Sequence, residues 1–237
     1  MRVLPSLALL AALLAPAVAH AGERNYGITE FDRIRVEGPL DVTITTGGGV
    51  SARAEGDAAA LDALTLRVDG RMLVVRMAAA ARGAFADRQL AAPSVRLTTP
   101  TLRAAILTGA GRIAVDRMRG DRIDLTVTGS GRIAAPRIEG DRLAASLIGS
   151  GSLVVAGRTP AASFVSRGAG TIDAAELAVN ELTVSSESAG EARFIAERTA
   201  RVTATGAGSI AIAGPANCIV RATGAGEVSC GKSAGED

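Results

Sequence analysis

Residues 109–131 read Gly-Ala-Gly-Arg-Ile-Ala-Val-Asp-Arg-Met-Arg-Gly-Asp-Arg-Ile-Asp-Leu-Thr-Val-Thr-Gly-Ser-Gly, and they contain one full unit of an internal repeat. Residues 111–130 and 131–150 are identical at 10 of 20 positions. The Gly-small-Gly tripeptide recurs every 18 to 20 residues as far as residue 226, once in the degenerate form Ser188-Ala189-Gly190. A regular period near 20 residues is typical of a solenoid, in which each repeat stacks on the one before it.

Side chains alternate between polar and apolar around each tripeptide, which indicates strands with one buried face. The residue that directly follows the tripeptide is polar in every repeat, and the next residue is apolar. The fourth residue before the tripeptide is apolar as well. These two apolar series are Ile113, Ile133, Leu153, Ile172, Ala192, Ile210 and Val228, and Ala105, Leu125, Ala145, Phe164, Val184, Val202 and Val220.

The repeat predicts an all-β fold, a parallel β-helix of about seven or more coils with a period of 18–20 residues. One strand before and one after each tripeptide form a coil, and coils stacked at about 4.8 Å place like positions in ladders. Glycine is expected at the sharp turns because it readily adopts φ > 0. The predicted turn glycines are Gly109, Gly111, Gly129, Gly131, Gly149, Gly151, Gly168, Gly170, Gly206, Gly208, Gly224 and Gly226. An up-and-down barrel or a sandwich is the alternative, but the equal spacing of identical turns argues against it.

The sequence before residue 100 lacks the repeat. Alternation predicts strands at residues 31–38 and 40–45, and Asp57 is a candidate N-cap for a short helix at 58–64. Strands at 64–68 and 72–76 around Asp69-Gly70 predict a hairpin. The alanine-rich residues 78–92 are expected to form a surface excursion. This region is expected to cover the exposed strand edges at the first coil.

The first 21 residues resemble a secretory signal peptide: Met1-Arg2, an apolar run, and the cleavable ending Ala19-His20-Ala21. An uncleaved N-terminal anchor is the alternative, and no other segment could span a membrane as a helix. The predicted organisation is a signal peptide at 1–21, one solenoid domain at 22–232 and a disordered tail at 233–237. Within the domain, 22–99 form the strands, hairpin and cap, and 100–232 form the coils.

Composition excludes several kinds of chemistry. Cleavage of the leader would remove His20, the single histidine, so Ser-His-Asp catalysis and histidine-ligated metals are excluded from the mature chain. A net charge of +2 gives no footprint for nucleic acid. Calcium β-rolls need Gly-Gly-x-Gly-x-Asp, and Ile113 stands where the aspartate should be. We therefore expect no metal, no cofactor and no catalytic residue.

The pattern Phe31-Asp32-x-Ile34-x-Val36-x-Gly38-x-x-Asp41-Val42, then Pro100-x-Leu102 and Leu107-x-Gly109-x-Gly111, resembles a bacterial family. This family is the "putative auto-transporter adhesin, head GIN domain" family, whose function is unknown. The resemblance covers about residues 28–232. It implies a right-handed parallel β-helix and an exported protein, located in the periplasm or at the cell surface of a Gram-negative bacterium. It carries over no catalytic or ligand-binding residue.

Cys218 and Cys230 flank the last tripeptide at positions that the alternation turns inward. In an oxidising compartment they could form a disulfide across the final coil, contributing about 3 kcal/mol in the loop-entropy model. Two buried free thiols are the alternative.

Charged pairs also repeat. Asp121-Arg122 and Asp141-Arg142 lie 20 residues apart and should stack, as should Arg112 and Arg132. Such ladders could bind acidic glycans or a cation, but solvated turn residues with weak ion pairs are the simpler interpretation. The tripeptide Arg119-Gly120-Asp121 is expected by chance in a chain rich in arginine and glycine.

The favoured function is a non-catalytic, exported β-solenoid of the cell envelope, an adhesin-like or scaffold module. Its ligand is unknown, and an envelope glycan or protein is the candidate partner. A polysaccharide lyase or hydrolase is the alternative, by analogy of fold. Such enzymes usually need a close carboxylate pair or a basic residue beside a metal site, often with aromatic platforms. The pattern reveals no inward or laddered carboxylate cluster, and aromatic residues make up only 2% of the chain.

Overall fold

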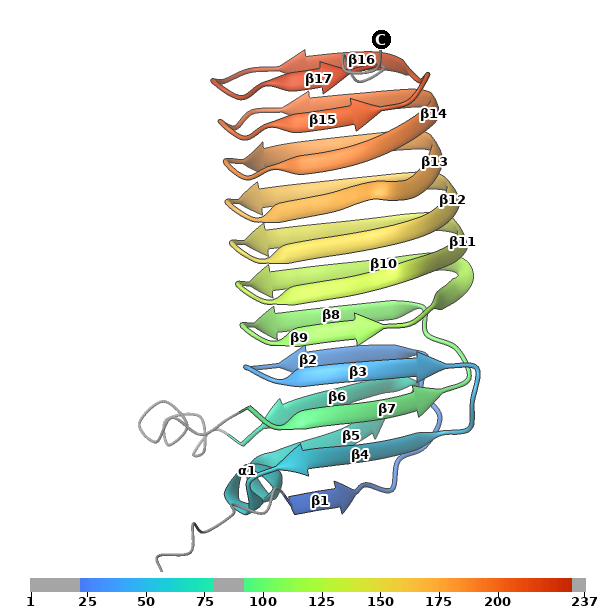
Figure 1. The fold of residues 1–237 in the computed structure, drawn as a ribbon, viewed down its shortest axis with the longest axis vertical. Helices are drawn as coiled ribbons and strands as arrows, with labels where there is room; N and C mark the ends of the chain where they lie inside the picture. The colour runs from blue at the N-terminus through green and yellow to red at the C-terminus, as the bar shows by residue number, and fades with distance from the viewer. Residues whose placement is uncertain (1–21, 79–91, 232–237) are drawn as a thin grey trace, which may run out of the picture.

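A computed structural model describes residues 22–78 and 92–231, whose strands wind into a tall rod of stacked coils (Figure 1). The predicted signal peptide, most of the alanine-rich excursion and the predicted tail at 233–237 lie outside the described residues. Strand makes up 71% of the structure and helix 3%. The prediction of an all-β parallel solenoid is confirmed.

Seventeen strands and one helix follow one another along the described chain. Their bounds are β1 (Gly22–Asn25), β2 (Arg33–Glu37), β3 (Asp41–Thr46), β4 (Ser51–Gly56), α1 (Ala58–Ala63), β5 (Leu64–Asp69), β6 (Met72–Met77), β7 (Ser94–Thr99), β8 (Ala104–Gly109), β9 (Arg112–Val115), β10 (Met118–Gly129), β11 (Arg132–Gly149), β12 (Ser152–Gly168), β13 (Thr171–Ser188), β14 (Ala192–Ala204), β15 (Ile210–Ala213), β16 (Asn217–Ala222) and β17 (Val228–Cys230).

Each long strand runs through almost a whole coil, from one tripeptide to the next. The strand β11, for example, starts after Gly131 and ends at Gly149, and it pairs in parallel with β10 and β12. The solenoid has about 6 turns, so the expected count of seven or more coils was slightly too high. The reason is geometric: seven tripeptides enclose only six intervals, and the last tripeptide is followed by a three-residue strand.

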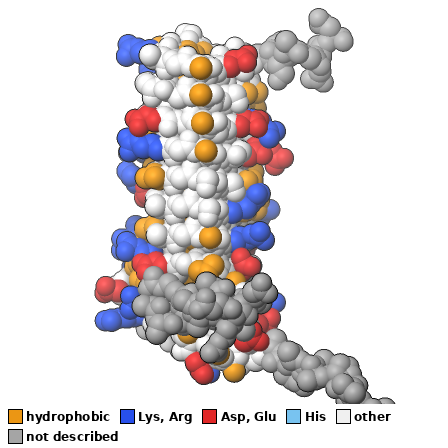
Figure 2. Space-filling model, turned by 90° about the vertical axis from the view of Figure 1, so that its left-hand side faces the viewer, with side chains coloured by type: hydrophobic (Ala, Val, Ile, Leu, Met, Phe, Trp, Pro, Cys, Tyr) orange, Lys and Arg blue, Asp and Glu red, His pale blue; other side chains and the backbone are white. Residues whose placement is uncertain are grey.

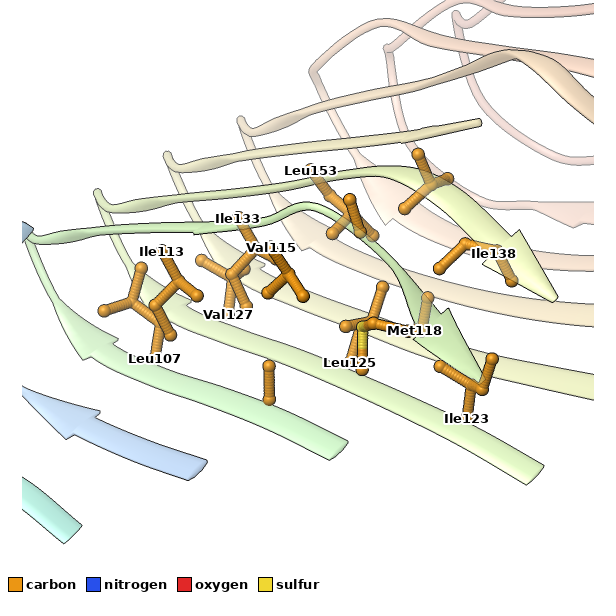
Figure 3. Close-up of a cluster of buried hydrophobic side chains, with 14 of the residues drawn as sticks. Leu107, Ile113, Val115, Met118, Ile123, Leu125, Val127, Ile133, Ile138 and Leu153 are labelled. Atoms are coloured by element: carbon orange, nitrogen blue, oxygen red, sulfur yellow. The ribbon is translucent and has the colours of Figure 1, made fainter. Parts of the chain in front are cut away.

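Like positions of successive coils lie directly over one another, as the alternation predicted. One ladder runs through Ile113, Ile133, Leu153, Ile172, Ala192, Ile210 and Val228. The labelled aliphatic side chains of neighbouring coils stack in the interior (Figure 3). Ile113, Ile133 and Leu153 are fully buried. Burial of each such side chain contributes about 1.5–3 kcal/mol, and the ladders join into one continuous core.

The N-terminal strands extend the same stack in an order that differs from the chain order. The strand β2 lies between β6 and β8, and β3 lies between β7 and β9, all in parallel. Below them the pairing becomes antiparallel, with β5 on β6, and β4 on β7 and β1 (Figure 1). The predicted hairpin and short helix are present, and Asp57 is the N-cap residue of α1, although its side chain makes no capping hydrogen bond.

We predict that Ile133→Ala lowers the free energy of unfolding by about 2–5 kcal/mol, because it opens a cavity in a fully stacked ladder. Ile148→Ala is the matched control, since this isoleucine lies outside the core with 40% of its side chain exposed, and its cost should stay below about 1 kcal/mol. Urea unfolding of the two variants measures the difference. Equal costs would contradict the assigned interior.

Candidate functional site

The twelve predicted turn glycines line one long edge of the rod, which we call the glycine ridge. Gly129 has φ +115°, as the turn prediction requires. Gly131 has no positive φ, but a Cβ there would lie 2.6 Å from the carbonyl oxygen of Gly111 in the coil below. A Cβ on Gly129 would likewise lie 2.7 Å from the carbonyl oxygen of Gly109. Both glycines of this tripeptide therefore allow close stacking, and Gly129 in addition makes the turn with its positive φ.

The glycine ridge is narrow and smooth. Backbone and small side chains form its crest, and charged side chains flank it on both sides (Figure 2). Small side chains offer little with which to recognise a ligand, so the ridge is best explained by the stacking of the coils.

We predict that Gly131→Ala destabilises the fold by about 1–3 kcal/mol, because the added methyl meets backbone and the side chain of Leu107. Ser130→Ala, in the same turn but exposed, should change stability by less than about 0.5 kcal/mol. Thermal unfolding of both variants, followed by circular dichroism, is the measurement. A Gly131→Ala protein as stable as the control would show that close stacking does not require this glycine.

A buried carboxylate holds the junction between the N-terminal strands and the coils. Asp32 lies 2.9 Å from Nε of Arg71 and 2.9 Å from Nε of Arg103. Hydrogen bonds from Arg71 to Asp32 and to Glu30 raise the pKa of this guanidinium above its ordinary value. The positive charges of Arg71 and Arg103 offset the buried negative charge of Asp32. Asp32 precedes β2, Arg71 lies in the turn between β5 and β6, and Arg103 precedes β8, so the cluster ties these three segments together.

The opposite long edge, where each coil bends back, is less regular than the ridge. Repeat lengths vary from 18 to 20 residues, and the sheets absorb the difference here. Between β11 and β12 the register shifts between Ala135 and Ile138, so that Pro136 and Arg137 form a bulge. Further shifts lie between Val154 and Ala156, where β12 pairs with β13, and between Ala174 and Glu181, where β13 pairs with β14. The bend can therefore vary while the ridge and the ladders stay in register.

An open hollow of about 970 Å³ lies at this bend, and we call it the edge groove. It is lined by residues 119–121, 137–141, 157–158 and 160. Arg119, Glu139 and Arg158 stack over one another in successive coils, and Nε of Arg119 lies 3.4 Å from a carboxylate oxygen of Glu139. Arg137 lies at the rim, on the bulge.

The edge groove corrects one expectation from the sequence. Three carboxylates, those of Asp121, Glu139 and Asp141, line a single hollow, although the sequence pattern revealed no laddered carboxylate cluster. The 20-residue recurrence of Gly-Asp-Arg at 120–122 and 140–142 was the signal that could have found it. The tripeptide Arg119-Gly120-Asp121 forms part of this lining, within the strand β10.

A second hollow of about 380 Å³ lies on the outer face of the sheet beside the bend, and we call it the arginine shelf. It is lined by Arg122, residues 142–144 and 161–163, Glu181, Thr183 and Arg201. The edge groove and the arginine shelf share a rim, because neighbouring residues of the chain line one hollow and then the other. Residues 121, 141 and 160 line the edge groove, and residues 122, 142 and 161, which follow them directly, line the arginine shelf. As predicted, Arg122 stacks on Arg142, and Arg112 on Arg132.

Two further observations concern the described part of the chain alone. Within residues 22–78 and 92–231, no group of three or more histidine, cysteine or acidic side chains is arranged to hold a metal ion. No helix in these ranges is long and apolar enough to cross a membrane.

Cys218 and Cys230 are joined as a disulfide between β16 and β17, with their Cα atoms 6.5 Å apart. The bridge ties together the two strands of the last coil, where Val220 is 40% exposed although its counterpart Val202 is buried. We interpret the bridge as a clamp on the coil end that has least packing.

We predict that the unreduced, denatured mature protein shows no thiol that reacts with a labelling reagent. Cys218→Ser/Cys230→Ser should lower the free energy of unfolding by about 2–4 kcal/mol. Mass spectrometry after labelling, with a reduced sample as the positive control, gives the thiol count. Two reactive thiols in the unreduced sample would exclude the bridge.

A family model described as "Putative auto-transporter adhesin, head GIN domain" matches residues 30–216. The chain belongs to this family. The match includes the Asp32 junction, the glycine ridge as far as Gly208, and both hollows at the bend. Among curated proteins, no relative matches the chain.

Solved structures share the fold of this GIN domain protein. A "putative adhesin" from Bacteroides fragilis superposes with a TM-score of 0.78 at 20% identity, covering 88% of this chain and 96% of its own. A "putative lipid binding protein" from Parabacteroides distasonis has a TM-score of 0.70 at 20% identity, covering 91% and 97%. A "putative adhesin" from Parabacteroides merdae has a TM-score of 0.67 at 17% identity, covering 90% and 98%. At these identities the likeness concerns the fold.

Proposed function

We propose that this GIN domain protein is an exported, non-catalytic, adhesin-like binding module of the bacterial cell envelope, and that the bend of its coils is the binding side. The edge groove is the observation that carries the proposal. It gathers three arginines and three carboxylates from successive coils into one open surface of about 970 Å³. Export is supported by the leader-like sequence of residues 1–21 and by the family, whose description names an adhesin.

The bend is suited to recognition because it is free to vary. Insertions and deletions of one or two residues are absorbed there without disturbing the ladders. Binding residues are commonly placed on such irregular segments and held by a rigid scaffold. The rest of each coil supplies that scaffold, since its interior is a continuous core.

The openness of the groove favours binding over catalysis. Catalytic sites usually exclude water from the reacting groups, and a carboxylic acid that donates a proton is usually desolvated. Asp121 and Asp141 are exposed, and Glu139 is already paired with Arg119. An open surface of fixed, alternating charges suits an extended polar ligand such as an envelope glycan, or a protein surface.

A polysaccharide-acting enzyme remains a second candidate, because of one observation. Asp121 and Asp141 occupy equivalent positions of adjacent coils, and the coil spacing of about 4.8 Å is close to the carboxylate separation of retaining glycosidases. The two functions differ in whether a bound polymer is cleaved.

We predict that the mature chain is retained by at least one envelope polysaccharide, or by intact bacterial cells, and releases no new sugar ends from any polymer in a panel. Asp121→Asn/Asp141→Asn is the informative variant, because loss of both carboxylates would abolish cleavage by the enzyme candidate. Retention on a glycan array and a reducing-end assay are the measurements. If the wild-type chain cleaves a polymer and the Asp121→Asn/Asp141→Asn variant does not, the protein is the enzyme instead. If none of the glycans or cells retains the chain, the proposed binding module is contradicted.

A further inference from the structure

We propose that the arginine shelf is a binding site for an acidic polysaccharide, a polymer that carries carboxylate or sulfate groups along its length. This rests on the proposed function and names the ligand class of its binding side.

The shelf has a surplus of positive charge that the protein does not neutralise. Arg122 is held by Asp124, with Nε 2.9 Å from a carboxylate oxygen, and Glu181 is paired with Arg198 at 3.1 Å. Arg142 and Arg201 are exposed, and neither has a carboxylate within 4.0 Å among the residues that the structure describes. Two free guanidinium groups therefore stand in this hollow, each able to bind a carboxylate or a sulfate through two hydrogen bonds.

The spacing of these groups indicates a polymer. The strand register places Arg201 three coils above Arg142 and two residues along the strand. Strand spacing and rise per residue then put their Cα atoms about 16 Å apart. A single small anion could bind only one of the two arginines and would leave the surface between them uncovered. An extended polyanion could bind both arginines at once.

The floor between the two arginines suits sugars. It presents Ala144, Ala161, Ser163 and Thr183, short side chains that leave an open surface with two hydroxyl groups. Ser163 and Thr183 are exposed and can exchange hydrogen bonds with sugar hydroxyls. Leu143 and Ala162 are buried beneath this surface, so no deep apolar pocket is open to a peptide side chain.

Nucleic acid fits the shelf less well than an acidic sugar polymer does. Proteins that bind single strands usually stack bases on aromatic side chains, and none of the described residues that line this hollow is aromatic. Phe164 follows Ser163, but it belongs to the core and is buried.

The two hollows also form a continuous track. Arg137 and Arg158 line the edge groove on the other side of the shared rim, and neither has an ion pair among the described residues. A polymer that crosses the rim would meet a second pair of guanidinium groups. Asp121 and Asp141 lie along this rim, and their negative charge would favour ligands whose acidic groups are spaced apart.

The test compares two double variants of the mature chain. Arg142→Gln/Arg201→Gln should weaken binding to heparin and to polygalacturonate about tenfold or more, because it removes the two guanidinium groups that would hold acidic groups of the polymer. Arg112→Gln/Arg132→Gln removes the same charge from two exposed arginines that lie in neither hollow, and it should weaken binding less than about threefold. Added salt should weaken wild-type binding, and neutral dextran should not bind.

Each other result counts against the shelf. No binding to either polymer, or equal losses in the two variants, would overturn the proposal, the second because it indicates non-specific attraction. Equal or tighter binding of single-stranded DNA or of poly-glutamate would assign the site to another class of macromolecule. If the Arg142→Gln/Arg201→Gln variant still binds other glycans or cells, the adhesin-like function stands and only the assignment of the arginine shelf is overturned. Circular dichroism of both variants should match that of the wild-type chain, because all four arginines are exposed.

Discussion

Parallel stacking of each coil on its neighbour is the constraint on which the whole structure depends. Backbone hydrogen bonds hold successive coils at the strand spacing of about 4.8 Å, so outside the bend each residue lies against its counterpart one repeat away. At the glycine ridge this leaves no room for a side chain, as a Cβ on Gly131 would meet the carbonyl of Gly111. In the interior the same register puts Ile133 on Ile113 and Leu153 on Ile133. Core and ridge are thus two consequences of one geometry.

The same constraint decides where function can lie. A glycine of the ridge or a large side chain of a ladder lies directly against the coils above and below it, so its replacement disturbs their stacking. The bend is different, because the register shifts at Ala135–Ile138 show that it accepts coils of unequal length. Charged side chains at the bend and on the adjoining sheet face are spaced by the distance between coils, about 4.8 Å, and the packed core of the solenoid holds them in place. This arrangement supports the proposed role as a binding module with an extended ligand.

The sequence was sufficient for the fold because the tripeptide recurs at a nearly constant spacing of 18 to 20 residues. Ten identities in residues 111–150 and the alternation at Ile113 or Ile133 predicted strands, their register and the core. The coil count and the bend were harder to predict. Around residues 116–121 charged residues and glycine interrupt the alternation, so the recurrence of Gly-Asp-Arg at 120–122 and 140–142 was the one signal that strand pairing continues through Arg119 and Glu139. The two hollows also depend on which side chains are short, such as Ala144 beside Arg142, and this matters only once the coils are stacked.

In the proposed function, ligands bind the bend and the adjoining shelf, and the other faces of the solenoid serve the fold. Arginine-selective chemical modification, read by mass spectrometry with and without an acidic polysaccharide, tests it most directly, because all but one of the 26 basic residues are arginine. We expect protection of Arg137, Arg142, Arg158 and Arg201, and unchanged reactivity of Arg112 and Arg132. Protection confined to Arg112 and Arg132, beside the glycine ridge, would contradict it.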